Sequence, residues 1–591
     1  MAIFVSILYL TLTRISIKKL LSIVFIAFLV FACKDSESSK AVTENNSKSV
    51  STVYYNGDII TMSGETAEYV QALVVTDGKI SFVGNSDEAM KIAGSGHIMI
   101  DLKGKTLLPG FIDPHSHFIN ALSMSNQANC SPSPAGNAND VAGIVEALKN
   151  IQTEKSIPEG ELIMGYGYDD TVMPEGKLLN RDDLDAAFPN NPVLVMHVSL
   201  HGAVINSKAM EKFGVSDKTE TPPGGIIVRK PGTNEPYGLI METAFLPIFE
   251  RLPQPSEAEL AQQIKDGQMI YAEAGVTTAQ EGLSHVSDVI ILKKAAENNA
   301  LFIDVVSYPF ITELDSVIST YGVEAFGNYN NKFKLGGIKI TIDGSPQGRT
   351  ALFTTPYLTG GPSGETDWLG ESTFSQDEVN IMLKKVYDNG LQSTFHANGD
   401  GAIDMCIKAH EFASNGNPTK ERRTTIIHSQ FVRADQLDKY VEYKMIPSLY
   451  TEHTFFFADA HIKNRGLEQA SFISPMKTAI SKGLKPTNHT DFNVVPINQL
   501  FVIWSAVNRV SRNGEVIGAD ERISPFQALQ AITSNAAYQY FEEDRKGMLK
   551  TGLLADLVIL DKNPLKISPM EIKDISVIET IKEGTTIYKK E

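Results

Sequence analysis

The stretch LLPGFIDPHSHFI, residues 107–119, decides the fold prediction. An apolar run leads into His115 and His117, which stand two positions apart. Alternate residues of a β-strand face the same side, so we expect both imidazoles to point into one space. Pro109-Gly110 and Asp113-Pro114 frame the pair at the exit from a strand into a loop. Because neutral imidazoles are good ligands for zinc and similar ions, this stretch predicts part of a metal site.

A lysine inside an apolar strand is the second signal. Lys339 lies in GGIKITI, residues 336–342, between two isoleucines. Burying an ammonium group is costly unless its charge is removed or paired. Carboxylation by CO₂ would give a carbamate able to bridge two metal ions. The alternative is an ion pair with an acidic residue such as Asp343.

Three further polar residues close or follow apolar runs. His396 ends LQSTFH, His428 ends TTIIH, and Asp491 lies in TNHTDFNVVP. Taken singly, each histidine is equally well explained as a core residue, and the aspartate as a cap or turn residue. Next to a metal, Asp491 would act as a ligand and as a general base.

The spacing of these residues predicts an α/β fold, a (β/α)₈ TIM-like barrel over residues 109–540. His396 and His428 are 32 residues apart, which fits one βα unit. His117 and Lys339 are 222 residues apart, too far for three such units, so we expect an insertion over approximately residues 130–250. The six residues then fall at the carboxyl ends of strands 1, 4, 5, 6 and 8, the face where barrel enzymes carry their chemistry.

Both flanks of this α/β region show short β-strands with glycine turns. Residues 51–108 contain the hairpin signal Asp77-Gly78, and residues 541–591 have the same texture. Separate sandwiches would each have a thin core. We therefore predict one small β-sandwich composed of both chain ends.

The N-terminus predicts export and a lipid anchor. Residues 1–32 combine basic residues with a short apolar run, as a secretory signal does. Val30-Phe31-Ala32-Cys33 is similar to a bacterial lipobox, which implies cleavage before Cys33 and lipid on its sulfur. Residues 33–50 are polar and serine-rich, as a flexible tether should be. We expect a bacterial lipoprotein of the outer membrane or periplasm; an uncleaved membrane anchor is the alternative.

Composition limits the partners. A formal net charge of -17 disfavours nucleic acid. We expect Cys130 and Cys406 to be free thiols; a single disulfide between them is the alternative. We expect a small-molecule substrate, and a homodimer is a further option.

Several motifs together resemble the amidohydrolase superfamily, in particular the amidohydrolase-3 branch that includes N-substituted formamide deformylases. These are GFIDPHSHF, KITIDGSPQGRTA, HANGDGA, HSQ and GLLADLVIL, and the resemblance covers roughly residues 50–590. The strand-8 motif departs from the Gly-Ser-Asp run of many relatives and reads Asn488-His489-Thr490-Asp491. This change, together with Glu452-His453, is expected to reshape the pocket.

The expected reaction is hydrolysis of a non-peptide C–N bond, of amide or formamide type, by metal-activated water. Asp491 would accept and return the proton, and His428 would help to stabilise the oxyanion. One or two divalent ions, zinc by preference, are expected, with the count depending on carboxylation of Lys339. The substrate-binding candidates are His201, Glu242, Arg349 and His453.

Other readings stay open from sequence. A deaminase or an ester hydrolase would use the same metal site. A non-catalytic, lipid-anchored metal- or ligand-binding protein, or a surface adhesin, belongs to a different class.

Overall fold

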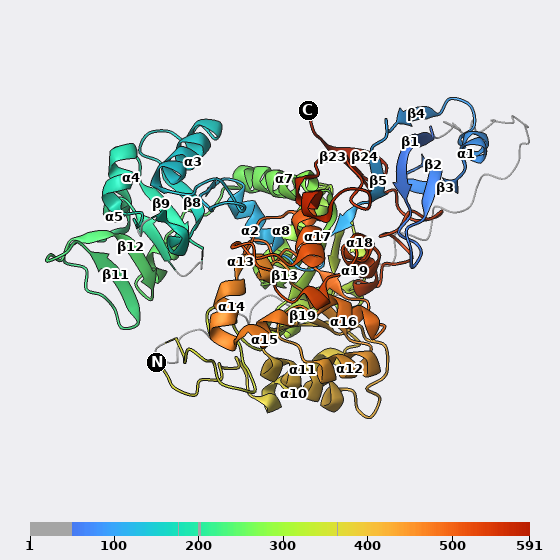
Figure 1. The fold of residues 1–591 in the computed structure, drawn as a ribbon. Helices are drawn as coiled ribbons and strands as arrows, with labels where there is room; N and C mark the ends of the chain where they lie inside the picture. The colour runs from blue at the N-terminus through green and yellow to red at the C-terminus, as the bar shows by residue number, and fades with distance from the viewer. Residues whose placement is uncertain (1–49, 175–176, 199–201, 363) are drawn as a thin grey trace, which may run out of the picture. The chain divides into compact units, whose positions relative to one another are not determined.

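A computed structural model describes residues 50–174, 177–198, 202–362 and 364–591. Strands and helices alternate through the middle of the chain, so the protein is α/β (Figure 1). The strands of the described ranges lie in four sheets. No helix in those ranges is both long and apolar enough to cross a membrane. Cys130 and Cys406 are buried free thiols, so the disulfide left open by the sequence is not formed.

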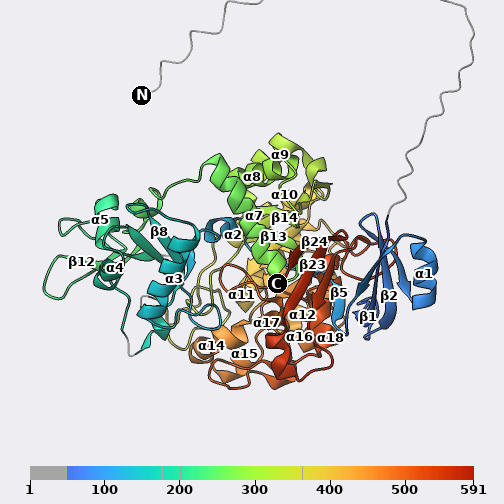
Figure 2. The ribbon, with the colours of Figure 1, turned by 90° about the horizontal axis from the view of Figure 1, so that it is seen from above.

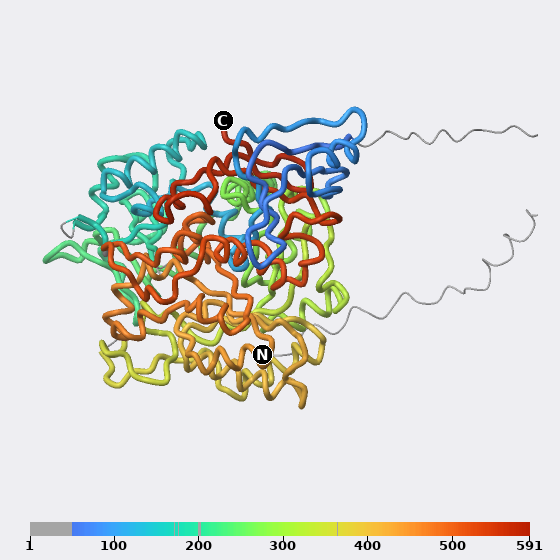
Figure 3. Tube along the Cα trace, turned by 45° about the vertical axis from the view of Figure 1, so that its right-hand side comes forward, coloured from blue at the N-terminus to red at the C-terminus, as the bar shows by residue number. Residues whose placement is uncertain are grey.

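The first sheet is built from both ends of the described chain. Its order is β24-β23-β22-β5-β1-β2-β3, with β4 paired to β1. Its strands are β1 (Thr52–Ile60), β2 (Tyr69–Thr76), β3 (Lys79–Gly84), β4 (Ile98–Asp101), β5 (Thr106–Pro109), β22 (Leu557–Leu560), β23 (Val577–Lys582) and β24 (Thr585–Lys589). Figure 3 shows the C-terminal segment running beside the N-terminal one. The structure shows one sheet here, and a two-layer sandwich stays a prediction.

Two local signals explain how this sheet is held. Asp77 and Gly78 both have positive φ, as a tight two-residue hairpin turn requires, and Thr76 pairs directly with Lys79. Leu107 of β5 pairs antiparallel with Ile559 of β22, so the two chain ends share one hydrogen-bonded ladder. The predicted hairpin is confirmed.

A six-stranded sheet forms a separate layer of the structure, drawn in cyan to green in Figures 1 and 2. Its order is β11-β12-β10-β9-β8-β7. Its strands are β7 (Ala128–Asn129), β8 (Ile163–Tyr168), β9 (Val193–His197), β10 (Gly202–Ile205), β11 (Gly225–Arg229) and β12 (Pro236–Glu242). The helices α3 (Val141–Glu154), α4 (Arg181–Ala187) and α5 (Ser207–Phe213) accompany it. We call this part the insertion.

The central strands are parallel and form two further sheets. One has the order β15-β16-β14-β13-β6, in which only β15 is antiparallel to its neighbour, and the other has the order β17-β18-β19-β20-β21. Their bounds are β6 (Phe111–Ile112), β13 (Val276–Ser284), β14 (Asp304–Pro309), β15 (Tyr329–Asn330), β16 (Phe333–Leu335), β17 (Ile338–Thr341), β18 (Ser393–Ala397), β19 (Thr425–His428), β20 (Ile446–Leu449) and β21 (Thr487–Asn488).

Helices follow most of these strands and cover them. They include α2 (Phe118–Met124), α7 (Glu257–Glu273), α8 (Val286–Glu297), α9 (Leu314–Tyr321), α10 (Gln376–Asp388), α11 (Asp400–Ala413), α12 (Ala434–Tyr443), α13 (His453–Phe456), α14 (Ala458–Arg465), α16 (Met476–Ser481), α17 (Gln499–Asn508), α18 (Pro525–Ala531) and α19 (Ser534–Gln539). Helices α7 and α10 each begin with a capping box, Ser256 with Glu259 and Ser375 with Glu378. One apolar core unites strand and helix residues, among them Phe111, Val305, Ile340 and Phe395.

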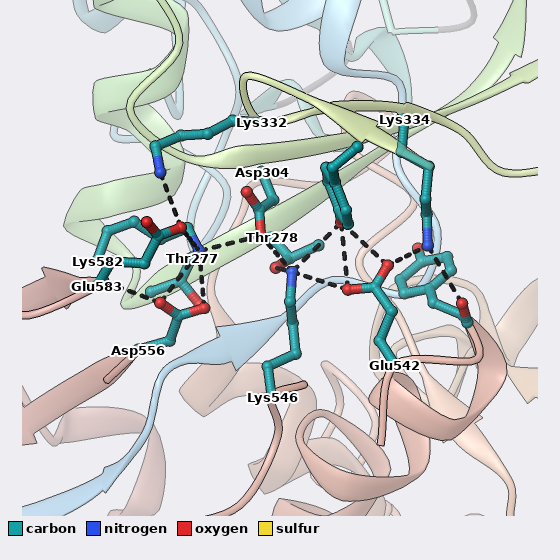
Figure 4. Close-up of polar contacts among 12 residues, drawn as sticks. Thr277, Thr278, Asp304, Lys332, Lys334, Glu542, Lys546, Asp556, Lys582 and Glu583 are labelled. Carbon is teal, nitrogen blue, oxygen red and sulfur yellow. Dashed lines mark hydrogen bonds and ion pairs between the residues drawn. The ribbon is translucent and has the colours of Figure 1, made fainter. Parts of the chain in front are cut away.

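A cluster of buried charges joins the chain ends to the central strands (Figure 4). It contains the three lysines Lys334, Lys546 and Lys582 and the three acids Asp304, Glu542 and Asp556, all buried. Lys546 pairs with Asp304 and, at 2.9 Å, with Glu542, while Lys582 lies 3.0 Å from Asp304 and 2.8 Å from Asp556. Burial alone would raise the pKa of Asp304, but the two lysines hold it well below its usual value. We call this set the charge cluster.

Candidate metal centre

The six predicted residues come from strands whose carboxyl ends meet. His115 and His117 follow β6, Lys339 lies in β17, His396 in β18 and His428 at the end of β19. Asp491 stands three residues beyond β21. Because neighbouring strands in each sheet are parallel, the residues after them emerge at one edge.

Asp491 is the residue around which the imidazoles gather. Its carboxylate oxygens lie 3.4 Å from His115 Nε2, 3.6 Å from His117 Nε2 and 4.0 Å from His428 Nε2. One ligand atom from each of His115, His428 and Asp491 lies within 4.8 Å of the others. The rings of His396 and His428 are 4.6 Å apart, which brings His396 to the same place.

A glutamine fixes the proton of His115. His115 Nδ1 lies 2.6 Å from Gln280 Oε1, while Gln280 Nε2 donates to Pro114 O and to the Tyr540 hydroxyl. The amide oxygen can only accept, so Nδ1 carries the hydrogen and the lone pair of Nε2 faces Asp491. Burial, with the charges of Lys339 and His117, holds the pKa of His115 well below its usual value, which keeps the ring neutral.

A second histidine plays the corresponding part for His428. His489 Nε2 lies 3.1 Å from His428 Nδ1, and His489 Nδ1 lies 3.0 Å from Ser448 Oγ. If His428 offers Nε2 to a cation, its Nδ1–H donates to His489, which in turn donates to the serine. Burial, followed by the neighbouring imidazoles, holds the pKa of His428 well below the usual value, and burial does the same for His489.

Carboxylates stand behind the other two histidines. Glu281 Oε1 lies 3.9 Å from His117 Nδ1, and the same side chain accepts from Ile119 N at 2.7 Å. Asp343 Oδ1 lies 3.3 Å from His396 Nδ1, and Asp343 also accepts from the backbone N–H groups of Asn398 and Gly399. Neither contact is a hydrogen bond, since the Glu281 distance is too long and His396 Nδ1 has no hydrogen-bond partner, so the two carboxylates act on these rings through their charge.

Lys339 is buried with no ion pair to any described residue. Its alternative partner Asp343 is occupied by the backbone donors beside β18 and does not pair with it. Burial lowers the pKa of Lys339 to about 8, although Asp491 and Glu281 oppose this. The neutral amine is the form that reacts with CO₂, and a lowered pKa makes that form easier to reach. The position therefore fits a carbamate.

Two of the candidate ligands have left-handed backbones. His428 has φ 70° and Asp491 has φ 52°. Such conformations are uncommon away from glycine and tend to occur where the fold holds a functional side chain in place. At Asp491 the holding contacts are visible, since its N–H donates to His115 O and the Thr490 hydroxyl donates to Asp113 at 2.5 Å. Burial raises the pKa of Asp113 to about 7.

The donor set therefore fits a divalent cation. His115 and His428 are neutral, each has its distal nitrogen engaged, and a carboxylate lies between them. Two imidazoles and a carboxylate are a common zinc ligand set.

The residues predicted to bind substrate have different placements. His453 is buried in α13, its Nδ1 2.9 Å from His461 Nε2 and its ring against Tyr450. Glu242 is exposed at the end of β12 in the insertion. Arg349 is half-buried in the loop after β17, where its carbonyl accepts from Trp368 Nε1. His201 lies outside the described residues, as do Cys33, the signal segment 1–32 and nearly all of the tether, so the lipid anchor stays a prediction.

Sequence reasoning missed the residues that hold the histidines. Gln280 and Glu281 lie side by side in β13, a strand that carries none of the predicted ligands. The adjacent glutamine and glutamate in the strand Val276–Ser284 were the available signal. His489 was noted only as a departure from the family motif, without its contact to His428.

His489→Ala is expected to weaken metal binding by about 10- to 100-fold, because His428 loses the acceptor that fixes its proton. Competition with a chromophoric chelator measures this affinity directly. His489→Gln, whose amide oxygen can still accept from Nδ1, should retain more of it. His285→Ala, the same change at an exposed histidine, is the control. Unchanged affinity in His489→Ala would show that the contact does not position His428.

Comparisons with known proteins show which family the whole described region resembles. The model of the amidohydrolase family matches residues 99–588. The chain is 27% identical to the Bacillus subtilis protein YtcJ over 549 residues, covering 91% of this chain and 99% of that one. It is 23% identical to the N-substituted formamide deformylase of Arthrobacter pascens, covering 88% and 95%. A solved metal-dependent hydrolase from Pyrococcus furiosus superposes with a TM-score of 0.68 at 26% identity, covering 87% and 100%.

Proposed function

The chain belongs to the amidohydrolase family and is a hydrolase of carbon–nitrogen bonds, and from this premise we propose that it cleaves a non-peptide amide or formamide bond with Asp491 as proton acceptor and donor. The observation that carries the proposal is the placement of the Asp491 carboxylate within 3.4–4.0 Å of three imidazoles. The name of the Arthrobacter relative supports a formamide-type substrate.

We propose zinc as the metal, which His115, His428 and Asp491 would hold. His117, His396 and a carboxylated Lys339 would supply the ligands of a second ion. When bound, the metal supplies Lewis acidity, which lowers the pKa of water towards neutrality. Two-ion occupancy depends on the carbamate, because an ammonium at Lys339 would repel a cation. The low pKa of the Lys339 amine and its lack of an ion pair support this part of the proposal.

The chain's own residues then divide the proton chemistry. Asp491 is an acceptor for the proton of the attacking water and returns it to the leaving nitrogen. His428 donates its Nδ1–H to His489, so its Nε2 has a lone pair and no hydrogen to donate, and its part at the developing oxyanion is limited to the electrostatic field of its ring. The burial of this edge excludes bulk water, which strengthens both interactions.

We also propose that the two parallel sheets are one eight-stranded barrel. β16 and β17 are halves of a single strand interrupted at Gly336-Gly337, and a bridge between Phe310 and Lys339 links the sheets on that side. On the other side, the N–H of Asp491 donates to His115 O, which ties the end of β21 to the end of β6. The insertion would then leave the barrel between strands 1 and 2.

A substrate panel and metal analysis test the proposal together. We expect the purified enzyme to contain stoichiometric zinc and to hydrolyse an N-substituted formamide faster than a matched cyclic amide, an ester or an aminopurine. The ester and aminopurine arms report on the ester hydrolase and deaminase alternatives, which would use the same centre. Faster turnover of either would replace the amide proposal.

Removing the metal is expected to abolish turnover reversibly. Dialysis against a chelator should lower kcat by about 100-fold or more, because water at its ordinary pKa is a poor nucleophile at neutral pH. Zinc added back should restore the rate, with magnesium as the negative control. Full activity in protein shown by elemental analysis to lack metal would contradict the mechanism.

A further inference from the structure

An apolar cleft opens between the insertion and the loop that follows Asp491. It encloses about 650 Å³ of empty space, part of it open to solvent. The insertion side includes Tyr166 and Asp169, and the facing side includes Phe456, Phe492, Asn493 and Arg512. Most of the lining side chains are apolar, four of them aromatic, as in sites for small organic ligands.

The cleft begins next to the metal centre. Phe492, which lines it, follows Asp491 directly, so their Cα atoms are about 3.8 Å apart. The carbonyl of Phe492 accepts from His117 N at 2.7 Å, and Asn493 accepts from Asn120 at 2.8 Å. A molecule seated in the cleft therefore lies against the same loop that carries the proposed proton acceptor.

Arg512 is the one cationic residue among the described residues that line the cleft. Its guanidinium lies 5.1 Å from the ring centre of Phe456 and 5.9 Å from that of Phe455. No hydrogen bond or ion pair joins it to any described residue, Asp169 of the same lining included, and its Nε is buried without a partner. Burial lowers the pKa of Arg512, with Asp169 opposing.

A second arginine stacked on an aromatic ring, Arg465, has the hydrogen-bond acceptors that Arg512 lacks among the described residues. Arg465 lies 3.9 Å from the ring centre of Phe353, yet its guanidinium donates to the carbonyls of Thr355 and Pro356 at 2.9 Å. The buried Nε of Arg512 has no such acceptor among the described residues. Buried donors without acceptors cost free energy, and the planar guanidinium fork is matched by a carboxylate.

We propose that the cleft binds substrates with an apolar or aromatic body and a carboxylate that pairs with Arg512. This rests on the proposed function, because it assigns the substrate class of that same centre. A single guanidinium with Asp169 nearby suits a monoanion better than a phosphate dianion. Arg512 thus takes the role that the sequence suggested for Arg349, which does not line the cleft.

Ligands without a cleavable bond test the cleft independently of catalysis. We expect the zinc-loaded enzyme to bind 3-phenylpropionate about 10- to 100-fold more tightly than 3-phenylpropanol, since a charged hydrogen bond is gained. Isothermal titration measures both. In Arg512→Gln the ratio should fall close to one while the affinity for the alcohol is retained, which also shows that the cleft is intact.

Two further variants sharpen the result. Arg512→Lys keeps the charge without the fork and should give an intermediate ratio, and it serves if Arg512→Gln does not fold. Lys463→Gln makes an equal change in charge at an exposed residue of α14 and should leave the ratio of the two affinities unchanged. A carboxylate preference that survives in Arg512→Gln, or one that the unmodified enzyme lacks, would overturn the proposal.

Turnover separates this inference from the function on which it rests. N-formylphenylalanine and N-formylphenethylamine share the formamide and the ring and differ by the carboxylate. We expect the first to have the higher kcat/KM, and Arg512→Gln to remove the difference. Arg512-dependent binding without hydrolysis of either compound would support the cleft and count against the formamide reaction. Hydrolysis of both compounds at equal rates would support the formamide reaction and count against the cleft proposal.

Discussion

Asp491→Asn is expected to lower kcat by about 10³-fold or more while the protein stays folded. The amide cannot accept a proton from water, yet it has nearly the same size and tolerates the left-handed backbone found at this position. His115 and His428 remain as ligands, so much of the metal should be kept. Steady-state kinetics, elemental analysis and a thermal melt on the same preparation distinguish loss of chemistry from loss of fold.

The control is an equal change in charge outside the site. Asp544 is exposed beyond α19, and Asp544→Asn should leave kcat and metal content as they are. Retention of more than about a tenth of the activity in Asp491→Asn would mean that another group accepts the proton. Glu281, the carboxylate behind His117, would then be the residue to change next.

Lys546→Met is expected to lower the free energy of unfolding by about 3–5 kcal/mol. Lys546 is fully buried and pairs with Asp304 and Glu542 inside the charge cluster (Figure 4). Its removal leaves two lysines to balance three buried acids, and an unpaired buried carboxylate is costly. The midpoint of urea unfolding should fall, while kcat of the remaining folded enzyme should change little, because the cluster contributes no residue to the metal centre.

Lys332 provides the comparison within the same region. It pairs with Glu583 at 2.8 Å, with both side chains partly exposed, and such pairs contribute only about 0–1 kcal/mol. Lys332→Met should therefore shift the urea midpoint much less than Lys546→Met. Equal shifts would show that the cluster gains nothing from burial of its charges.

Sequence could predict the parts of the site that depend on local pattern, namely where a strand ends and how far apart successive strands are. An apolar run ending in a polar residue gives a strand and its exit, and the intervals between such runs give the βα repeat. These signals placed His115, Lys339, His396 and His428 on the elements where the structure has them. Asp491 was harder, because β21 is only two residues long, and its assignment depended on its spacing from the other candidates rather than on a strand pattern of its own.

The remaining features depend on contacts between distant segments. Gln280 meets His115 across 165 residues, and His489 meets His428 across 61. Neither pair has a spacing that sequence alone would single out. Arg512 is similar, since nothing around it in sequence shows that its guanidinium reaches an aromatic cleft rather than solvent.

The pairing of β5 with β22 also governs when the molecule can finish folding. Pro109 and Leu557 are direct partners, yet they are 448 positions apart in the sequence. At ordinary ribosomal speeds that interval lasts on the order of 20–90 s, during which the edge of β5 has no partner. The nascent polypeptide must therefore keep this edge from aggregating until its last thirty or so residues emerge. A stop codon placed upstream of Leu557 would leave the edge open for good.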